Sequence, residues 1–430
     1  MRVGNVAIRR GSRKLLPGIL KLSFRLSISV LCVVAHPASA QRWAEPAPAT
    51  EEASLAQTLI AAIRSERWLD AMEIADRYRG SQTSSFSQFQ AFAYMMTGRL
   101  DLVSELQREG RIPSANICDD PSGRTYRDAV ETIIKAAEHH RAVVIQEFHW
   151  NAQHRFLLHA LLPRLRAMGF TDFAAEDFEG DPEEYRTARY PQDAPGFHST
   201  REPVFADAVR VAIALGYKLT PYEAAFPPPP EVERKDFQSY RSNQQAENLY
   251  ERIFAHDSSS RAIIYTGVGW AREAADPKFP DFVPMLTHLR ELSGIDPLTV
   301  DQTTCRQPES RANGTPVVAF DSAGNPVVRG VSSGAFDLQV RYAPVAYEDP
   351  GRAEWLYRLG RKPVPIPDAL RPENRPFIAE AHLQSEPDDA SPVDRIYLGA
   401  TESLPLMLPA GRFRISVQPR EAEPVIVVVE

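Results

Sequence analysis

Three things that this 430-residue chain lacks limit what it can be. It has only three cysteines, which are too few for a zinc site built on cysteine ligands. No uninterrupted apolar run reaches the roughly 18 residues that a membrane-spanning helix requires. With 43% hydrophobic and 24% charged residues, the composition lacks the bias of a disordered, collagen-like or coiled-coil chain. The sequence is therefore that of a globular protein, and its length suggests roughly two to three domains.

The N-terminus has the pattern of a secretory signal peptide. Its first 25 residues contain seven basic residues and no acidic residue. A short apolar run at 26–35 follows, and Ala38-Ser39-Ala40 comes soon after it. A basic start, an apolar centre and an Ala-x-Ala end are typical of a cleaved export signal. We expect residues 1–40 to be removed and the mature protein to be periplasmic or secreted.

Removal of this segment would change both the charge and the cysteine count. It takes away seven basic residues and no acidic residue from a chain with a formal charge of −7, which leaves −14. A protein this acidic is a poor nucleic-acid binder, because phosphates require a basic surface. The two remaining cysteines, Cys118 and Cys305, could pair in an oxidising compartment or stay as separate thiols.

Residues 41–118 are expected to form helical hairpins. Apolar residues recur at three- and four-residue spacing, as at Leu55, Leu59 and Ile63, which is the pattern of amphipathic helices. The hairpins are similar to tetratricopeptide repeats, which usually need about three units for independent stability. We therefore expect them to pack on the next domain, and a protein partner could bind them.

The rest of the mature chain falls into two regions. Residues 119–305 alternate apolar strands with helices of ten or more residues, which predicts an α/β domain with a mostly parallel sheet and crossover helices. Its expected strands are 142–148, 172–178, 217–224, 261–267 and 298–303. Residues 306–430 instead contain segments with period-two alternation, such as 336–341, which predict a small β-rich C-terminal region.

Acidic residues occupy the ends of the expected strands. Glu147 ends the first and is followed by His149, Glu176 ends the second, Glu223 ends the third, and Asp301 lies on the fifth. Open parallel sheets bind ligands at the carboxyl ends of their strands. If the first three strands are adjacent, three carboxylates and an imidazole gather at one edge. Carboxylates that close need a proton, a cation or a substrate, so this edge is the candidate site.

These motifs, in this order, resemble the erythromycin esterase/ChaN/Tiki superfamily. The similarity spans about 130–305 and rests on Glu147-Phe148-His149, His154-Arg155, a strand ending at Glu176, and a helix that carries Arg241. The resemblance implies an α/β domain with Glu and His residues clustered over the sheet. Members of the superfamily include ring-opening esterases, haem-binding lipoproteins and metal-dependent peptidases.

The resemblance also implies roles for individual residues. The catalytic set would be Glu147, His149 and Glu176, with His149 as the general base that activates a water molecule. Arg241 would bind an anionic substrate group or stabilise an oxyanion. The expected substrate-binding residues are Glu223, Arg241, His154 and Trp270.

Three positions depart from the pattern of the superfamily. Gln146 replaces a glycine, Ser242 replaces an acid and Trp270 replaces a histidine. Tryptophan can neither accept a proton nor bind a metal, which argues against a mechanism with two histidines. Two functions therefore stay open. One is a hydrolase that acts on a small molecule through the Glu/His cluster; the other is a non-catalytic protein that binds haem, a divalent metal or a partner protein. The sequence does not decide between haem and a divalent metal as the cofactor, and it identifies no metal ligands.

Overall fold

The computed structural model describes residues 51–79, 84–118, 120, 123–178, 182–192, 201–308, 314–348, 351–419 and 422–430. The expected signal peptide and the ten residues after it lie outside this part of the chain. Within the described residues, no helix has both the length and the apolar character needed to cross a membrane.

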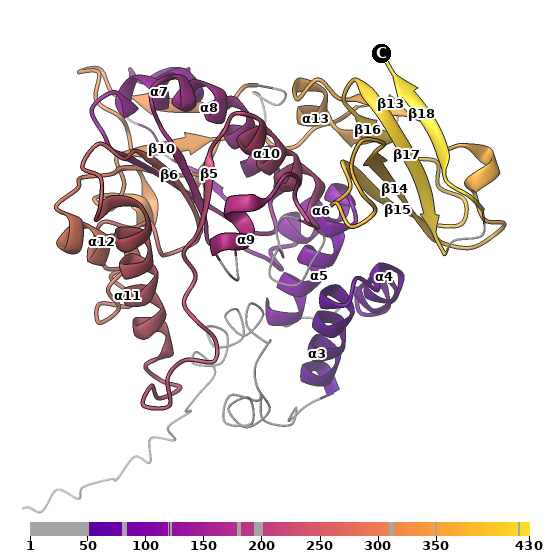
Figure 1. Ribbon diagram of the computed structural model, residues 1–430, viewed down its shortest axis with the longest axis horizontal. Coiled ribbons are helices and arrows are strands. Elements are labelled where there is room, and N and C mark those ends of the chain that lie inside the picture. The colour runs from indigo at the N-terminus through magenta and orange to yellow at the C-terminus, as the bar shows by residue number, and fades with distance from the viewer. Residues whose placement is uncertain are drawn as a thin grey trace, which may run out of the picture.

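Two helical hairpins open the described chain, as the sequence predicts (Figure 1). Gly98 separates the helices of the second hairpin, and its positive φ of 71° is one that glycine adopts without strain. The helices are α3 (Glu51–Arg64), α4 (Trp68–Arg77), α5 (Ser84–Met96) and α6 (Leu100–Arg108).

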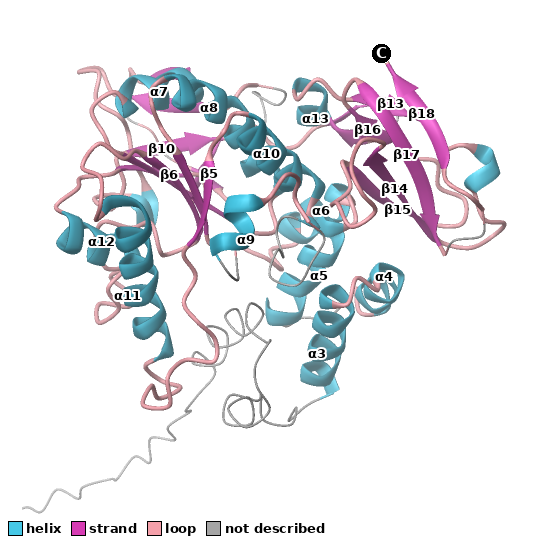
Figure 2. Cartoon of the chain, viewed as in Figure 1, coloured by secondary structure: helices cyan, strands magenta, loops and turns pink. Residues whose placement is uncertain are grey.

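An eight-stranded sheet forms the centre of the α/β part of the molecule, on the left of Figure 2. Its strand order is β2-β9-β10-β7-β3-β6-β4-β5. All pairs from β10 to β5 are parallel, whereas β9 is antiparallel to both of its neighbours. This arrangement confirms the predicted α/β class. The strands are β2 (Thr125–Asp128), β3 (Ala142–Glu147), β4 (Asp172–Ala175), β5 (Lys218–Pro221), β6 (Ala262–Gly267), β7 (Leu298–Asp301), β9 (Val317–Phe320) and β10 (Leu338–Arg341).

Helices cover both faces of the sheet, so its central strands are buried on both sides. Val143 and Ile145 of β3 pack in one core with α7, α8 and α10, while Ala142 and Val144 pack in another with α11 and α12. Alternate residues of β3 thus face opposite layers, which explains why the strand is apolar throughout. The helical elements are α7 (Ala129–Ala137), the 3₁₀ turn η1 (Ala152–Arg155), α8 (Phe156–Ala167), α9 (Pro182–Thr187), α10 (Pro203–Ala214), α11 (Phe237–Leu249), the π-helical turn η3 (Tyr250–Phe254) and α12 (Met285–Ser293).

The central sheet continues past the boundary predicted at residue 305. β10 pairs in parallel with β7, and β9 pairs with β10 and β2. The alternating segment 336–341, expected in the C-terminal region, thus supplies a strand of the α/β sheet. Alternation reports only that one strand has two unlike faces, and it does not identify the sheet that the strand joins.

A β-rich region ends the chain, as predicted, and lies beside the helical hairpins (Figure 1). Its largest sheet has the order β15-β14-β17-β18. Ile378 and Tyr397 of this sheet share a core with α3–α6, and the Tyr397 N–H donates to the Thr97 carbonyl. The elements are β11 (Tyr347–Glu348), β12 (Arg352–Ala353), α13 (Glu354–Arg358), β13 (Lys362–Val364), the 3₁₀ turn η6 (Asp368–Leu370), β14 (Phe377–Leu383), β15 (Asp394–Leu398), β16 (Leu406–Leu408), β17 (Gly411–Gln418) and β18 (Val425–Val429), whereas the 3₁₀ turn η5 (Gly330–Ser332) lies between β9 and β10 of the central sheet.

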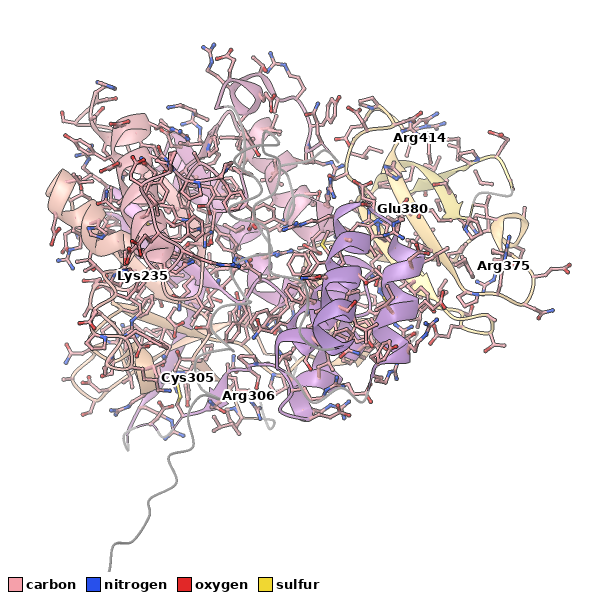
Figure 3. All side chains as sticks on the ribbon, turned by 90° about the horizontal axis from the view of Figure 1, so that it is seen from below. Lys235, Cys305, Arg306, Arg375, Glu380 and Arg414 are labelled. Carbon is pink, nitrogen blue, oxygen red and sulfur yellow. A yellow bond between two sulfur atoms is a disulfide. The ribbon has the colours of Figure 1, made fainter. Side chains whose placement is uncertain are left out.

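A disulfide joins Cys118 to Cys305, the two cysteines whose pairing the sequence left open, with their Cα atoms 5.6 Å apart (Figure 3 labels Cys305). It lies beside the short parallel pair of β1 (Asn116–Ile117) and β8 (Cys305–Arg306). The bond fastens the segment after the hairpins to the segment that leaves β7.

Candidate functional site

The candidate site lies at the carboxyl ends of β3, β6 and β4. The sequence prediction treated the strands of Glu147 and Glu176 as adjacent, and this is wrong, because β6 lies between β3 and β4. Glu147 ends β3, Glu176 follows β4, and Gly267 ends β6 between them. The two carboxylates still face a common space, since the residue between them has no side chain.

His149 fills this space. Its Nδ1 lies 3.0 Å from Oε1 of Glu147, and its Nε2 lies 3.7 Å from Oε2 of Glu176. A third carboxylate, that of Asp177, lies 3.8 Å from Nδ1. The His149 side chain is 23% exposed, whereas those of the three acids are at most 4% exposed. The imidazole is therefore the group of this cluster that solvent or a substrate reaches most easily.

Gly267 makes this arrangement possible. A Cβ atom at this position would lie 2.3 Å from Nε2 of His149 and 3.1 Å from Oε2 of Glu176. Real Cβ atoms essentially never show a contact as short as 2.3 Å, so the imidazole could not keep its place beside any larger residue. The backbone N–H of Gly267 also donates to Oε2 of Glu176 at 2.6 Å.

Buried partners hold Glu147 in place. Arg155 contacts both of its oxygens at 3.3 Å, and the Tyr265 hydroxyl donates to Oε2 at 2.6 Å. The same guanidinium binds Glu202 at 2.6 Å and donates to the His149 carbonyl at 3.0 Å. The sequence prediction gave no role to Arg155, although it assigned the preceding residue, His154, to substrate binding.

Arg241 is bound by the cluster instead of being open to a substrate. Its guanidinium donates to Glu176 at 2.6 Å and to both oxygens of Glu223, and it lies 4.6 Å above the ring of Trp270. The Arg241 side chain is only 4% exposed. Its expected role in binding an anionic group is therefore not supported, because its charge is already shared by two carboxylates. Trp270, which is 7% exposed, supports this arginine from below.

The structure buries His154, one of the expected substrate-binding residues, beneath the loop that follows β3. Its Nδ1 accepts the backbone N–H of Phe148, and its Nε2 lies 3.0 Å from the Asn151 amide. The residue is 2% exposed, and its ring packs against Tyr342. Burial lowers the pKa of His154 to about 4, so this ring is neutral at physiological pH. It is a core residue that shapes the loop after β3.

The charges of the cluster set its protonation states. Burial raises the pKa of Glu147, but Arg155 and His149 outweigh that effect and lower this pKa to about 2. Burial raises the pKa of Glu176 too, yet Arg241 and His149 hold it below its usual range. Burial lowers the pKa of His149, whereas Asp177, Glu147 and Glu176 together raise it to about 9. The cluster is therefore an imidazolium surrounded by carboxylates at neutral pH.

Neither of the cofactors considered from the sequence fits this cluster well. One ligand atom each from Glu147, His149 and Asp177 lies within 4.8 Å of the others, which is compact enough to suggest a metal ion. However, Arg155 and Tyr265 already occupy the oxygens of Glu147. A cation would have to displace the buried guanidinium. Haem iron would need to reach an imidazole nitrogen, and the His149 side chain is only 23% exposed, which leaves little of the ring accessible to a group as large as haem.

Comparisons with known proteins identify no family. No family model and no curated protein matches the chain. Among solved structures, the type III effector HopBA1 is 11% identical with a TM-score of 0.33, over 54% of this chain and 98% of its own. ChaN of Campylobacter jejuni, which binds heme cofacially, is 10% identical with a TM-score of 0.31, over 41% of this chain and 87% of its own. RRSP, a MARTX toxin effector domain from Vibrio vulnificus, is 14% identical with a TM-score of 0.30, over 58% of this chain and 44% of its own.

At these TM-scores the similarity is limited, and we assign no function from it. Membership of the erythromycin esterase/ChaN/Tiki superfamily thus stays a prediction from the sequence motifs.

Proposed function

We propose that this protein is an exported hydrolase whose reaction centre is the cluster of Glu147, His149 and Glu176. The observation that carries the proposal is the setting of His149, a partly exposed imidazole with buried, ionised carboxylates against both ring nitrogens. A base aligned by a fixed hydrogen-bond partner is the arrangement that general acid–base catalysis requires.

Each group has a distinct task in this mechanism. Glu147 accepts the Nδ1–H of His149 and fixes the orientation of the ring. The neutral Nε2 then removes a proton from a water molecule, which attacks an ester or amide carbonyl. The imidazolium that forms returns the proton to the leaving group, and Glu176 stabilises the imidazolium from the opposite side.

The charges of the site favour neutral or cationic substrates. The two arginines beside the cluster are each shared between two carboxylates, Arg155 by Glu147 and Glu202 and Arg241 by Glu176 and Glu223. Asp177 adds a further acid beside His149. An anionic substrate would therefore meet a site whose cations are already neutralised. The alternative of a haem or metal carrier is not favoured, because Arg155 and Tyr265 already bind the oxygens of Glu147 that a metal would need, and little of His149 is accessible to haem.

The first prediction concerns His149. We expect His149→Ala and His149→Gln to lower kcat/KM by about 10²- to 10⁴-fold on a panel of p-nitrophenyl esters, the usual contribution of a general base. Both variants also lose an imidazolium that faces three buried carboxylates, so some loss of stability is expected, and kcat/KM is compared at a temperature where thermal unfolding shows each variant to be folded. His139→Ala, at an exposed position after α7, is the matched control and should keep full activity. Unchanged turnover in both His149 variants would exclude this mechanism.

The second prediction is the pH dependence of the reaction. A general base acts in its deprotonated form, and the pKa of His149 is raised to about 9. We therefore expect kcat/KM to rise about tenfold per pH unit from neutral pH and to level off near pH 9. An ordinary histidine would give a plateau near pH 7, and a plateau at that pH would show that the surrounding carboxylates do not act as proposed.

The third prediction concerns export. Ala-Ser-Ala before Gln41 predicts that the mature chain begins at Gln41. N-terminal sequencing of protein recovered from the periplasm or medium should give a start at Gln41, and Ala40→Leu should block processing. An intact N-terminus on the recovered protein would contradict the assignment.

A further inference from the structure

A buried polar cluster lies on the side of β3 away from His149. Its centre is the carboxylate of Asp301, at the end of β7, which is 0% exposed. Its Oδ1 accepts from the Gln146 amide and from the N–H and hydroxyl of Thr303. Its Oδ2 accepts from the Ser332 hydroxyl and the Gln339 amide. Five donors therefore fix Asp301 in place, and it takes no part in the candidate site.

Gln146 connects this fixed group to the turn after β6. Its Nε2 donates to Asp301 at 3.2 Å, while its Oε1 accepts the backbone N–H of Gly269 at 2.8 Å. Gly269 has a φ of 99°, a conformation that depends on glycine and gives the turn its direction. The residue that follows this glycine is Trp270. The Gln146 side chain is thus the bridge between an immobile carboxylate and the start of the segment that carries the tryptophan.

From Trp270 the contacts lead back to the candidate site. The indole lies 4.6 Å from the guanidinium carbon of Arg241, and Arg241 donates to Glu176 at 2.6 Å. Glu176 in turn faces Nε2 of His149 at 3.7 Å. A shift of the turn at Gly269 would therefore move the support under Arg241 and change how Glu176 is held.

We propose that Gln146 is a positioning residue that holds the turn Gly267–Trp270 against Asp301, so that Trp270 supports Arg241 and Arg241 orients Glu176 toward His149. Gln146 and Trp270 both depart from the motif pattern of the superfamily, and in this proposal they act together. The Gln146 amide fixes the turn, and the Trp270 indole supports Arg241. The effect of Gln146 on the rate of catalysis rests on the proposed function, whereas its effect on the conformation of the turn does not.

The experiment compares two glutamines that share one partner. Gln146 and Gln339 are both buried and both donate to Asp301, but Gln339 bonds to the backbone of Arg329 instead of Gly269. Gln146→Leu and Gln339→Leu should therefore cost comparable stability, while only the first should release the turn. Acrylamide quenching of Trp270 fluorescence reports that release. The signal of Trp270 is isolated from the chain's five tryptophans by subtracting the spectrum of the same variant with Trp270→Phe.

We expect Gln146→Leu to raise the quenching constant of Trp270 about two- to fivefold, because the turn loses its hydrogen bond from Gly269 to Gln146, and Gln339→Leu to leave the constant unchanged. Should Gln146→Leu fail to fold, Gln146→Asn, whose side chain is one methylene shorter, gives the same comparison. An equal increase of the Trp270 quenching constant in the Gln146 and Gln339 variants, or no increase in either, would overturn the proposal.

Turnover supplies the second readout. On any p-nitrophenyl ester that the wild type hydrolyses, Gln146→Leu should lower kcat about tenfold with little change in KM, and Gln339→Leu should lower neither. An equal loss of kcat in both variants would show a general effect of destabilisation and would refute positioning. If the wild type hydrolyses no ester, the proposed function fails while the quenching experiment still decides whether Gln146 holds the turn.

Discussion

Gly267→Ala should reduce the proposed hydrolysis by about 10²-fold or more and leave the protein folded. The added methyl group would lie 2.3 Å from Nε2 of His149, so the imidazole must rotate out of the space between Glu147 and Glu176. The φ of Gly267 is not in the positive range that alanine avoids, and the shortest contacts of the added methyl group are with the end of a partly exposed side chain, while that with Glu176, at 3.1 Å, needs a shift of only a few tenths of an ångström. The clash is therefore relieved by moving His149 instead of the strand. Measurements of kcat/KM and of thermal unfolding on the same preparation test both parts.

Gly399→Ala is the matched control for this substitution. Gly399 also lacks a positive φ, and the nearest atom to its added Cβ would be Oε2 of Glu402 at an ordinary 3.5 Å. We expect this variant to keep its full activity. Full activity in Gly267→Ala as well would mean that the position of His149 between the carboxylates is not needed for the reaction.

The class of the fold could be predicted from the sequence, but the order of the strands could not. β3 is buried on both faces and is flanked by helices, and this local pattern identifies a strand of an α/β sheet. The insertion of β6 between β3 and β4 depends on how two long crossovers pass over the sheet. No single segment records that choice, because every central parallel strand has the same apolar character.

The candidate site shows the same division between local and distant information. Glu147, His149 and Glu176 could be identified because strand ends are local features that meet at one edge. The position of Arg241 on a helix near the site was also expected from the motif resemblance. Its pairing with two acids was not, because that depends on side chains from β4, β5 and α11 meeting in space.

Two neighbouring residues of one turn illustrate why the role of Arg155 could not be predicted from the sequence. His154 and Arg155 stand side by side in η1, yet His154 turns back under Phe148 while Arg155 reaches Glu147. The sequence prediction assigned His154 to substrate binding because it belongs to the His154-Arg155 motif at the start of the helix after β3. In the structure the arginine is the residue tied to the site, since its guanidinium reaches Glu147 and helps to neutralise that fully buried carboxylate.

Arg155 should therefore be among the residues most important for stability. Its guanidinium is 0% exposed and is shared by Glu147 and Glu202, and Glu202 also caps the N-terminus of α10 through the N–H groups of Val204 and Phe205. Arg155→Met keeps much of the apolar stem and leaves both carboxylates buried without their cation. Breaking a buried ion pair in this way costs about 3–5 kcal/mol, which we expect as a loss in the free energy of unfolding measured with urea at pH 7.

The pH dependence of this loss distinguishes its electrostatic origin from a packing defect. Arg155 helps to lower the pKa of Glu147 to about 2, so in its absence that carboxyl takes up a proton at a higher pH. Protonation removes the uncompensated charge, and the gap between wild type and Arg155→Met should therefore narrow as the pH falls toward 4. The control Arg186→Met removes an arginine that is 65% exposed and paired with Glu183, and should change stability by at most about 0.5 kcal/mol at any pH. A loss in Arg155→Met that stays constant from pH 7 to pH 4 would mean that the guanidinium acts by filling space, and the charge balance assigned to the cluster would be wrong.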